Sequence, residues 1–212
     1  MADQTQRVAD RRSILAIIAW AIYGSLYVAG FWFAGCVAGF VVMLLIIANE
    51  YRRGGLKIMD CTSLAYFALA AAISATSAAY AFDRYHVVIV WGVFAAVAWA
   101  TLAAGFPFTI QYARERAPRE AWNSPAFARI NRTLTVMWAA IFTFGAIMGV
   151  MTIAVGHAFA LGIAIPMSAM GVGYAFNSEY PKRFADRRDT AARAAPAATH
   201  QTGIEATRRA DG

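Results

Sequence analysis

Two histidines are the residues of this chain whose type and position come nearest to a chemical site. His86 and His157 each lie at the end of a long apolar segment, and a pair of imidazoles on one side of a membrane can hold a haem or a metal ion. Asp83 could orient His86, but the further ligands of a zinc site are missing from this part of the sequence. We therefore expect no metal and no cofactor at either histidine.

Signatures of catalysis are also missing from the sequence. It contains no Gly-x-Ser-x-Gly, no His-Glu-x-x-His, no phosphate-binding glycine loop and no paired-aspartate metal motif. The apolar segments carry hydroxyl groups, such as those of Ser74, Thr76 and Ser168, but no carboxylate or lysine near a centre. A proton-coupled pump or a retinal protein needs such a group. The two cysteines, Cys36 and Cys61, are expected to be packing residues. The sequence therefore predicts that this protein is not an enzyme.

The elements that position these residues are predicted from composition. Of the 212 residues, 60% are hydrophobic and 15% are charged, whereas soluble domains have about 45–50% apolar and about 25% charged residues. The mean hydropathy is +0.49. A helix needs about 20 apolar residues to cross a bilayer, and the first and last charge-free segments are each long enough for two helices. The prediction is an all-α, polytopic membrane protein, a bundle of six transmembrane helices. Their expected ranges are Ser13–Ala29, Phe31–Asn49, Thr62–Ala81, Val87–Gly105, Leu134–Val155 and Ala158–Phe176.

The basic residues predict how this bundle is oriented. With six spans, all of the 19 lysines and arginines except Arg84 fall on one side, which the positive-inside rule makes cytoplasmic. We expect a multi-pass protein of the bacterial inner membrane with both termini in the cytoplasm. Residues 1–12 are a cytoplasmic tail, residues 13–178 the transmembrane domain and residues 179–212 a disordered cytoplasmic tail. The net charge of +7 then reflects topology or binding of anionic lipid headgroups rather than of nucleic acid, since acidic residues are interleaved.

The cytoplasmic loop 109–132 is the most structured polar segment that the sequence predicts. A helix is expected to start at Ser124 and Pro125, and the loop is amphipathic, so it should lie on the membrane surface. The candidate interaction residues all belong to this loop. Trp122 is expected to anchor at the interface, Arg129 and Arg132 to reach headgroups, and Gln111 and Asn131 to be sheltered, bonding to each other or to backbone near Pro107 or at the next helix start.

Small residues at four-residue spacing indicate where helices approach closely. Gly35 and Gly39 form one such pair, and Gly145 and Gly149 form the other. They predict packing inside one bundle or, alternatively, a homodimer or docking with another membrane protein. Pro166 is expected to kink the last span.

Two short motifs give the chain a resemblance to a known family. The first is Phe106–Gln111, and the second is Phe127–Asn131 followed by Val136, Met137, Trp138 and Phe142. Together with the layout of residues 13–156, they resemble the intracellular septation protein A family of small bacterial inner-membrane proteins. The resemblance implies a role in envelope biogenesis and cell division without an established enzymatic activity.

The sequence thus leads to two hypotheses of different classes. The first is a non-enzymatic membrane protein that acts through contacts with proteins or lipids of the envelope. The alternative is a small-solute channel or transporter, for which Ser74, Thr76 and Ser168 would line a hydrated cavity. A dry bundle would favour the first hypothesis.

Overall fold

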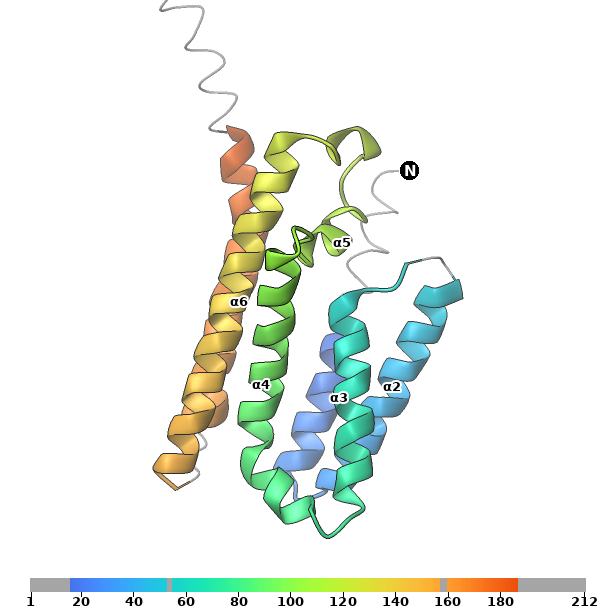
Figure 1. Cartoon of the computed structure of the whole chain (residues 1–212), viewed down its shortest axis with the longest axis vertical. Helices are drawn as coiled ribbons and strands as arrows, with labels where there is room; N and C mark the ends of the chain where they lie inside the picture. The colour runs from blue at the N-terminus through green and yellow to red at the C-terminus, as the bar shows by residue number, and fades with distance from the viewer. Residues whose placement is uncertain (1–15, 53–54, 157–159, 187–212) are drawn as a thin grey trace, which may run out of the picture. The chain divides into compact units, whose positions relative to one another are not determined.

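The computed structural model describes residues 16–52, 55–156 and 160–186, and among these the chain is helical without any strand. The protein forms two compact units that divide after Met170. Figure 1 shows the helices of the first unit, which run alternately up and down. The element ranges are Ala16–Val28 (the first helix), α2 Trp32–Arg52, α3 Ile58–Ser74, α4 Ala79–Ala103, α5 Thr109–Ala113, η1 Arg119–Ala121, α6 Pro125–Ala154 and the π-helix η2 Ala160–Ala164.

An α-helix follows η2 directly and covers residues 165–186, so it continues into the second unit. In that unit the rings of Phe176 and Tyr180 stack with centroids 5.0 Å apart. Lys182 donates a hydrogen bond to Glu179 one turn earlier, at 2.8 Å, a spacing that supports a helix. Residues 179–186, which the sequence assigned to a disordered tail, are therefore helical, and the rest of that tail lies outside the described residues.

Within the described residues, three helices are long and apolar enough to cross a membrane: α2, α4 and α6. The first helix and α3 are apolar but shorter. Large apolar side chains point away from the bundle, including Leu45 on α2 and Ile147 and Val150 on α6, which are each more than half exposed. Soluble monomers rarely expose such continuous apolar surface. The fold is therefore that of a helical membrane protein, while a count of six spans is not established by these helices.

Some helix boundaries differ from the predicted ones. The fourth predicted span begins at Val87, but α4 begins at Ala79, so that Asp83, Arg84 and His86 lie within a helix rather than at a helix end. Charged residues marked the end of an apolar segment in the sequence, yet they are accommodated in the first turns of α4. Similarly, residues 125–132 are the first turns of the 30-residue α6 and not a separate surface helix.

Three glycines with positive φ close the turns between helices. Gly30, Gly105 and Gly156 have φ of 84°, 77° and 83°, a left-handed conformation that glycine adopts without steric cost. At Gly105, the following residue Phe106 donates its backbone N–H to Thr101 O at 2.9 Å, as in the Schellman motif. The expected helix start at Ser124 is confirmed: its hydroxyl accepts a hydrogen bond from Phe127 N at 3.1 Å.

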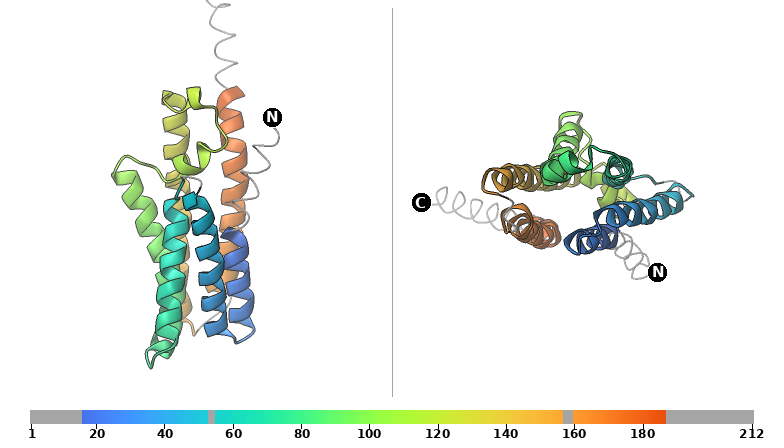
Figure 2. Two further views of the ribbon diagram at one scale, coloured as in Figure 1. Left: turned by 90° about the vertical axis from the view of Figure 1, so that its right-hand side faces the viewer. Right: turned by 90° about the horizontal axis from the view of Figure 1, so that it is seen from below.

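The first unit has two packed regions, visible as neighbouring helix pairs in Figures 1 and 2. Aromatic rings fill the region between the first helix, α2 and α3. A second cluster lies mainly between α4 and α6, around Trp91, Trp138 and Phe142. Both clusters keep bulky rings in the interior, so the helices are held by close packing, which is the main attraction between helices in lipid.

All four glycines of the two small-residue pairs lie at contacts within the chain. A Cβ atom on Gly39 would lie 2.7 Å from the Phe67 ring, and one on Gly145 would overlap the Trp91 ring. Gly35 faces the first helix at Tyr23 and Leu26, and Gly149 faces Val88 of α4. These faces are therefore used for packing inside the bundle, and a homodimer through the same glycines would have to displace those contacts.

We predict that Gly145→Ala destabilises the protein by about 1–3 kcal/mol, the range for overpacking a filled site. Gly92→Ala on α4 is the matched control, because nothing lies within 4 Å of a Cβ there. Alanine is the better helix former, so the control should be neutral or slightly stabilising. Thermal unfolding of both variants in detergent, followed by circular dichroism, measures the difference. Equal unfolding temperatures for the two variants would contradict the packing at Gly145.

Candidate functional site

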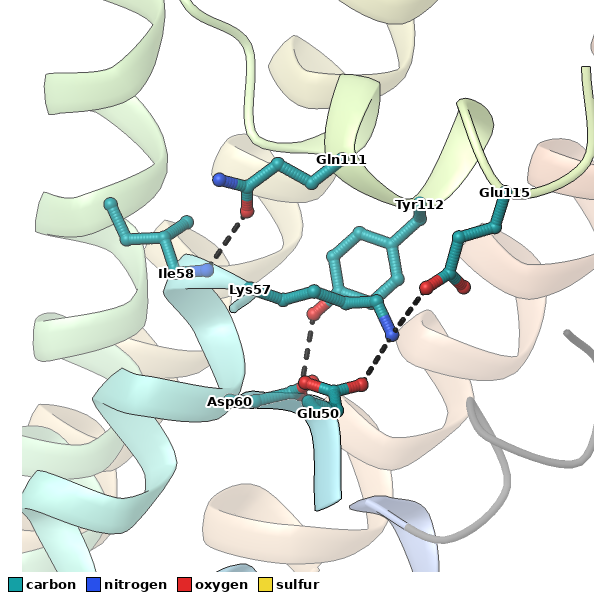
Figure 3. Close-up of polar contacts among 7 residues, drawn as sticks. All are labelled: Glu50, Lys57, Ile58, Asp60, Gln111, Tyr112 and Glu115. Carbon is teal, nitrogen blue, oxygen red and sulfur yellow. Dashed lines mark hydrogen bonds and ion pairs between the residues drawn. The ribbon is translucent and has the colours of Figure 1, made fainter. Parts of the chain in front are cut away.

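The most chemically distinctive site is a group of buried charges at one end of the first unit. We call Glu50, Lys57, Asp60, Tyr112 and Glu115 the charged cluster (Figure 3). Glu50 lies in the last turn of α2, Lys57 and Asp60 at the start of α3, and the other two in and just after α5. Three segments that are separate in the sequence therefore meet there.

The local sequence explains why these segments meet. The connection from α2 to α3 is short, so Glu50 and Lys57 are brought together across it. After α4, Gly105 and Pro107 reverse the chain and place α5 over the start of α3. Gln111 of α5 then accepts a hydrogen bond from Ile58 N at 2.8 Å, which satisfies one of the backbone N–H groups left open at a helix start. Lys57, the residue before the helix, makes no side-chain cap of its own.

Lys57 is the central cation of the charged cluster. Its Nζ lies 2.6 Å from Glu50 Oε1 and 3.1 Å from Glu115 Oε1, and its side chain is only 4% exposed. The same Nζ is 5.2 Å from the centre of the Tyr112 ring, close enough for a cation–π attraction. Burial alone would lower the pKa of Lys57, but the two carboxylates outweigh burial and raise it. The ammonium group is therefore charged at neutral pH.

Asp60 is the carboxyl group most affected by its surroundings. It is buried and accepts a hydrogen bond from Tyr112 OH at 3.3 Å. Burial, followed by the negative charge of Glu50, raises the pKa of Asp60 to about 6, although Lys57 and Tyr112 act in the opposite direction. Asp60 precedes the predicted membrane-spanning residues, which start at Thr62. A carboxyl group at this position can exchange a proton close to neutral pH.

A second buried polar group attaches α5 to α6. The Thr109 hydroxyl donates to Asn131 O at 2.8 Å and lies 2.9 Å from the Thr135 hydroxyl. The amide of Asn131 donates to Phe127 O at 2.8 Å. Since these residues are buried, loss of any one of these hydrogen bonds would leave a buried polar atom without its partner. This group fixes α5 from one side while the charged cluster holds it from the other.

The predicted interaction residues are only partly brought together. Asn131 is buried, whereas Gln111 is exposed, so the expectation that both are sheltered is wrong for Gln111. They form no amide pair: Gln111 reaches across to α3, and Asn131 bonds within α6. Arg129 and Arg132 are exposed on α6. Trp122 donates its Nε1–H to Ala117 O at 3.1 Å, and the guanidinium groups of Arg114 and Arg119 lie over its ring.

At the opposite end of the unit, His86 belongs to a smaller polar group. Its Nδ1 lies 2.6 Å from Asp83 O, and Tyr27 OH donates to Asp83 Oδ1 at 3.1 Å. A surface cavity of about 580 Å³ is lined by Tyr27, Trp32, Tyr80 and Asp83 with smaller neighbours. No group of three or more potential metal ligands occurs in the described part of the chain. His157 lies outside it, so the expected absence of a histidine-bound cofactor stays a prediction.

The charged cluster was missed by reasoning from the sequence. In the sequence, Lys57 belongs to the basic residues predicted on the cytoplasmic side, and Glu50 and Asp60 to the acidic residues interleaved with them. A signal was present, because both acids directly adjoin long apolar segments. The sequence does not say which way such border residues point, and all three are buried in the structure.

Comparison of the chain with protein-family models, with curated proteins and with solved structures finds no match. The resemblance to the septation protein A family therefore stays a prediction based on the two motifs.

We predict that Lys57→Met destabilises the protein by about 3–5 kcal/mol, because it leaves buried carboxylates without their cation. Lys182→Met is the matched control: Lys182 also pairs with a carboxylate, but both side chains of that pair are exposed. Exposed pairs contribute little to stability, so the control should unfold like the wild type. Denaturant or thermal unfolding in detergent, followed by tryptophan fluorescence, compares the variants. If the Lys57→Met protein is as stable as the control, the charged cluster does not stabilise the contact between α2, α3 and α5.

Proposed function

We propose that this chain is a multi-pass protein of the bacterial cytoplasmic membrane that acts without catalysis, through contacts with lipids and with other envelope proteins. The observation that carries the proposal is the aromatic packing of the interior. The ring of Trp20 lies 4.6 Å from Phe67, 5.4 Å from Tyr66 and 5.6 Å from Phe94, measured between ring centroids. These closely packed rings occupy space that a solute path through these helices would need.

The hydroxyl groups that motivated a transport function also support the proposal. Ser74, Thr76 and Ser168 donate to carbonyl oxygens of their own chain segment, three or four residues earlier, at 2.7–2.9 Å. Hydroxyls that bond locally in this way are common in membrane helices and need no solute. Thr76 and Ser168 are exposed. The local bonding of these hydroxyls therefore supports the proposal over a transport function.

Exposed arginines provide the lipid contacts in this proposal. Arg129 and Arg132 are exposed near the start of α6, and Arg114 and Arg119 flank Trp122 in the preceding segment. All four belong to the segment that connects α4 to the body of α6, which Figure 1 places at one end of the unit. A basic residue near an anionic leaflet gains about 1 kcal/mol. This arrangement supports a cytoplasmic face that binds lipid headgroups.

A channel or transporter is the second candidate. The cavity beside Tyr27, Tyr80 and Asp83 favours it, since it offers aromatic walls and a carboxylate at the opposite end of the helices. The packed rings around Trp20 argue against a continuous path from this cavity.

The proposed topology has six spans with both termini in the cytoplasm. Reporter fusions after Gly105 and after Phe176 should report the cytoplasm, and a fusion after Ser77, in the turn before α4, should report the periplasm. The physical reason is the concentration of basic residues on one side, with Arg84 as the exception. A periplasmic report after Phe176 would contradict the six-span topology.

We predict that Arg129→Gln/Arg132→Gln lowers the preference of the protein for anionic lipid several-fold, following the value of about 1 kcal/mol per basic residue. Arg129→Lys/Arg132→Lys is the matched control, because it retains both charges. Native mass spectrometry of protein released from nanodiscs measures bound phosphatidylglycerol relative to phosphatidylcholine. An unchanged ratio in the glutamine variant would exclude headgroup binding there. Transport would instead be favoured if the wild type carried a solute into proteoliposomes and the Asp83→Asn variant did not.

A further inference from the structure

One carboxylate oxygen in the charged cluster lacks a hydrogen-bond partner. Glu50 is 5% exposed, and its Oε2 is buried without a donor, while its Oε1 accepts from Lys57. A buried, charged oxygen left without a donor costs a large part of its hydration free energy. A stable structure is expected to supply a donor for this atom.

The net charge of the buried groups also indicates that a proton is missing from the fully ionised cluster. Glu50, Asp60 and Lys57 are all at least nine-tenths buried. With every group ionised they carry two negative charges and one positive charge. Glu115, the other partner of Lys57, is 25% exposed and is therefore not counted among the buried groups. One additional proton would make the three buried groups neutral.

The geometry places that proton between Glu50 and Asp60. The two carboxyl groups lie next to each other in Figure 3, within range of a side-chain hydrogen bond. Two ionised carboxylates cannot bond to each other, because both only accept. If one of them is protonated, its O–H donates to the other, and the unpartnered oxygen of Glu50 gains its hydrogen bond. In other proteins, two adjacent carboxyl groups share one proton, which avoids the repulsion between two negative charges.

We propose that Glu50 and Asp60 form a proton-binding site in which the two carboxyl groups share one proton, and that loss of this proton weakens the attachment of α5 to the α2–α3 connection. The site binds a proton whether or not the chain contacts lipids or partner proteins, so it does not depend on the proposed function. The raised pKa of Asp60 agrees with it. Among the described residues, the titratable or charged groups that face the pair are Lys57 and Cys61 from the start of α3 and Tyr112 and Glu115 from α5 and the residues after it.

The contacts of the pair explain why the proton affects α5. Tyr112 of α5 donates to Asp60, and Lys57 joins Glu50 to Glu115. When the proton leaves, the two carboxylates repel each other, and separation of the two side chains disturbs both contacts. Because the pKa of Asp60 is higher in the folded state than the ordinary value of 3.8, stability is greatest at low pH. It falls as the pH rises from about 4 through about 6.

Infrared spectroscopy of the full chain in lipid nanodiscs tests the proposal directly. Ordinary aspartate and glutamate side chains, with pKa values of about 4, are ionised at a pH of about 5.5. At that pH we expect the C=O band of a protonated carboxyl group, which disappears on alkaline titration with a midpoint near 6. The band should be absent in Asp60→Asn and in Glu50→Gln. It should persist in Glu115→Gln, which neutralises a carboxylate of the same cluster outside the pair.

The pH dependence of unfolding provides the second readout. Wild type should lose stability as the pH rises from about 4 through about 6, and Asp60→Asn should remove that loss, since an amide imitates the neutral carboxyl group. If Asp60→Asn does not fold, the same measurement is made on Glu50→Gln, which should also remove the loss of stability. The proposal is overturned if wild type lacks the band, or if the band and its titration persist in either variant. Neither result would alter the lipid preference or topology on which the proposed function is tested.

Discussion

The end of the bundle where α2, α3 and α5 meet depends on one buried ammonium group. Lys57 lies between the carboxylates of Glu50 and Glu115 and against the ring of Tyr112. These contacts join the end of α2, the start of α3 and the segment around α5. Without the cation, carboxylates would remain in a site of low polarity, where charges are costly unless paired. The three segments therefore lie together because the buried charged side chains at the end of α2 and the start of α3 must be neutralised.

Hydrogen bonds also connect helices along the interior of the bundle, although Trp32 Nε1 and Asn131 Oδ1 are buried there without a partner. Thr109, Asn131 and Thr135 attach α5 to α6 through a connected set of hydrogen bonds. Ser63 accepts from the Trp20 indole and donates to a carbonyl of its own helix. Elsewhere, aromatic rings and glycine contacts fill the space. The small number of polar groups in the interior agrees with the proposed function in contacts with other molecules.

The charged cluster adds a property that a passive scaffold does not require. Its three buried charged groups do not balance, and the unpartnered oxygen of Glu50 lies where a second carboxyl group could supply a proton. A site of this kind links the protonation state to the packing of α5 on the α2–α3 connection. If lipid headgroups bind to the nearby arginines, membrane contact and proton binding would occur within the same segment of the chain.

Much of the architecture followed from the sequence because a bilayer imposes strict requirements. Apolar segments must be helical, since backbone groups in lipid have no other partners. Local signals placed the helix start at Ser124 and the break after Gly105, and the glycine pairs at 35/39 and 145/149 lie at helix contacts. The predicted boundary of α4 is wrong because Asp83 and Arg84 lie in the second turn of the helix, whereas the sequence pattern places charged residues outside it.

Only the tertiary structure decided which polar residues act together. Gln111 caps α3 instead of pairing with Asn131, and Glu50, Lys57 and Asp60 turn inward instead of facing water. The distances between them depend on how α5 folds back over α3, a long-range contact that local sequence patterns do not encode. Sequence by itself therefore determined the class of fold and its apolar surfaces, which depend on periodicity and composition. The charged cluster depends on burial, which exists only once the helices have packed.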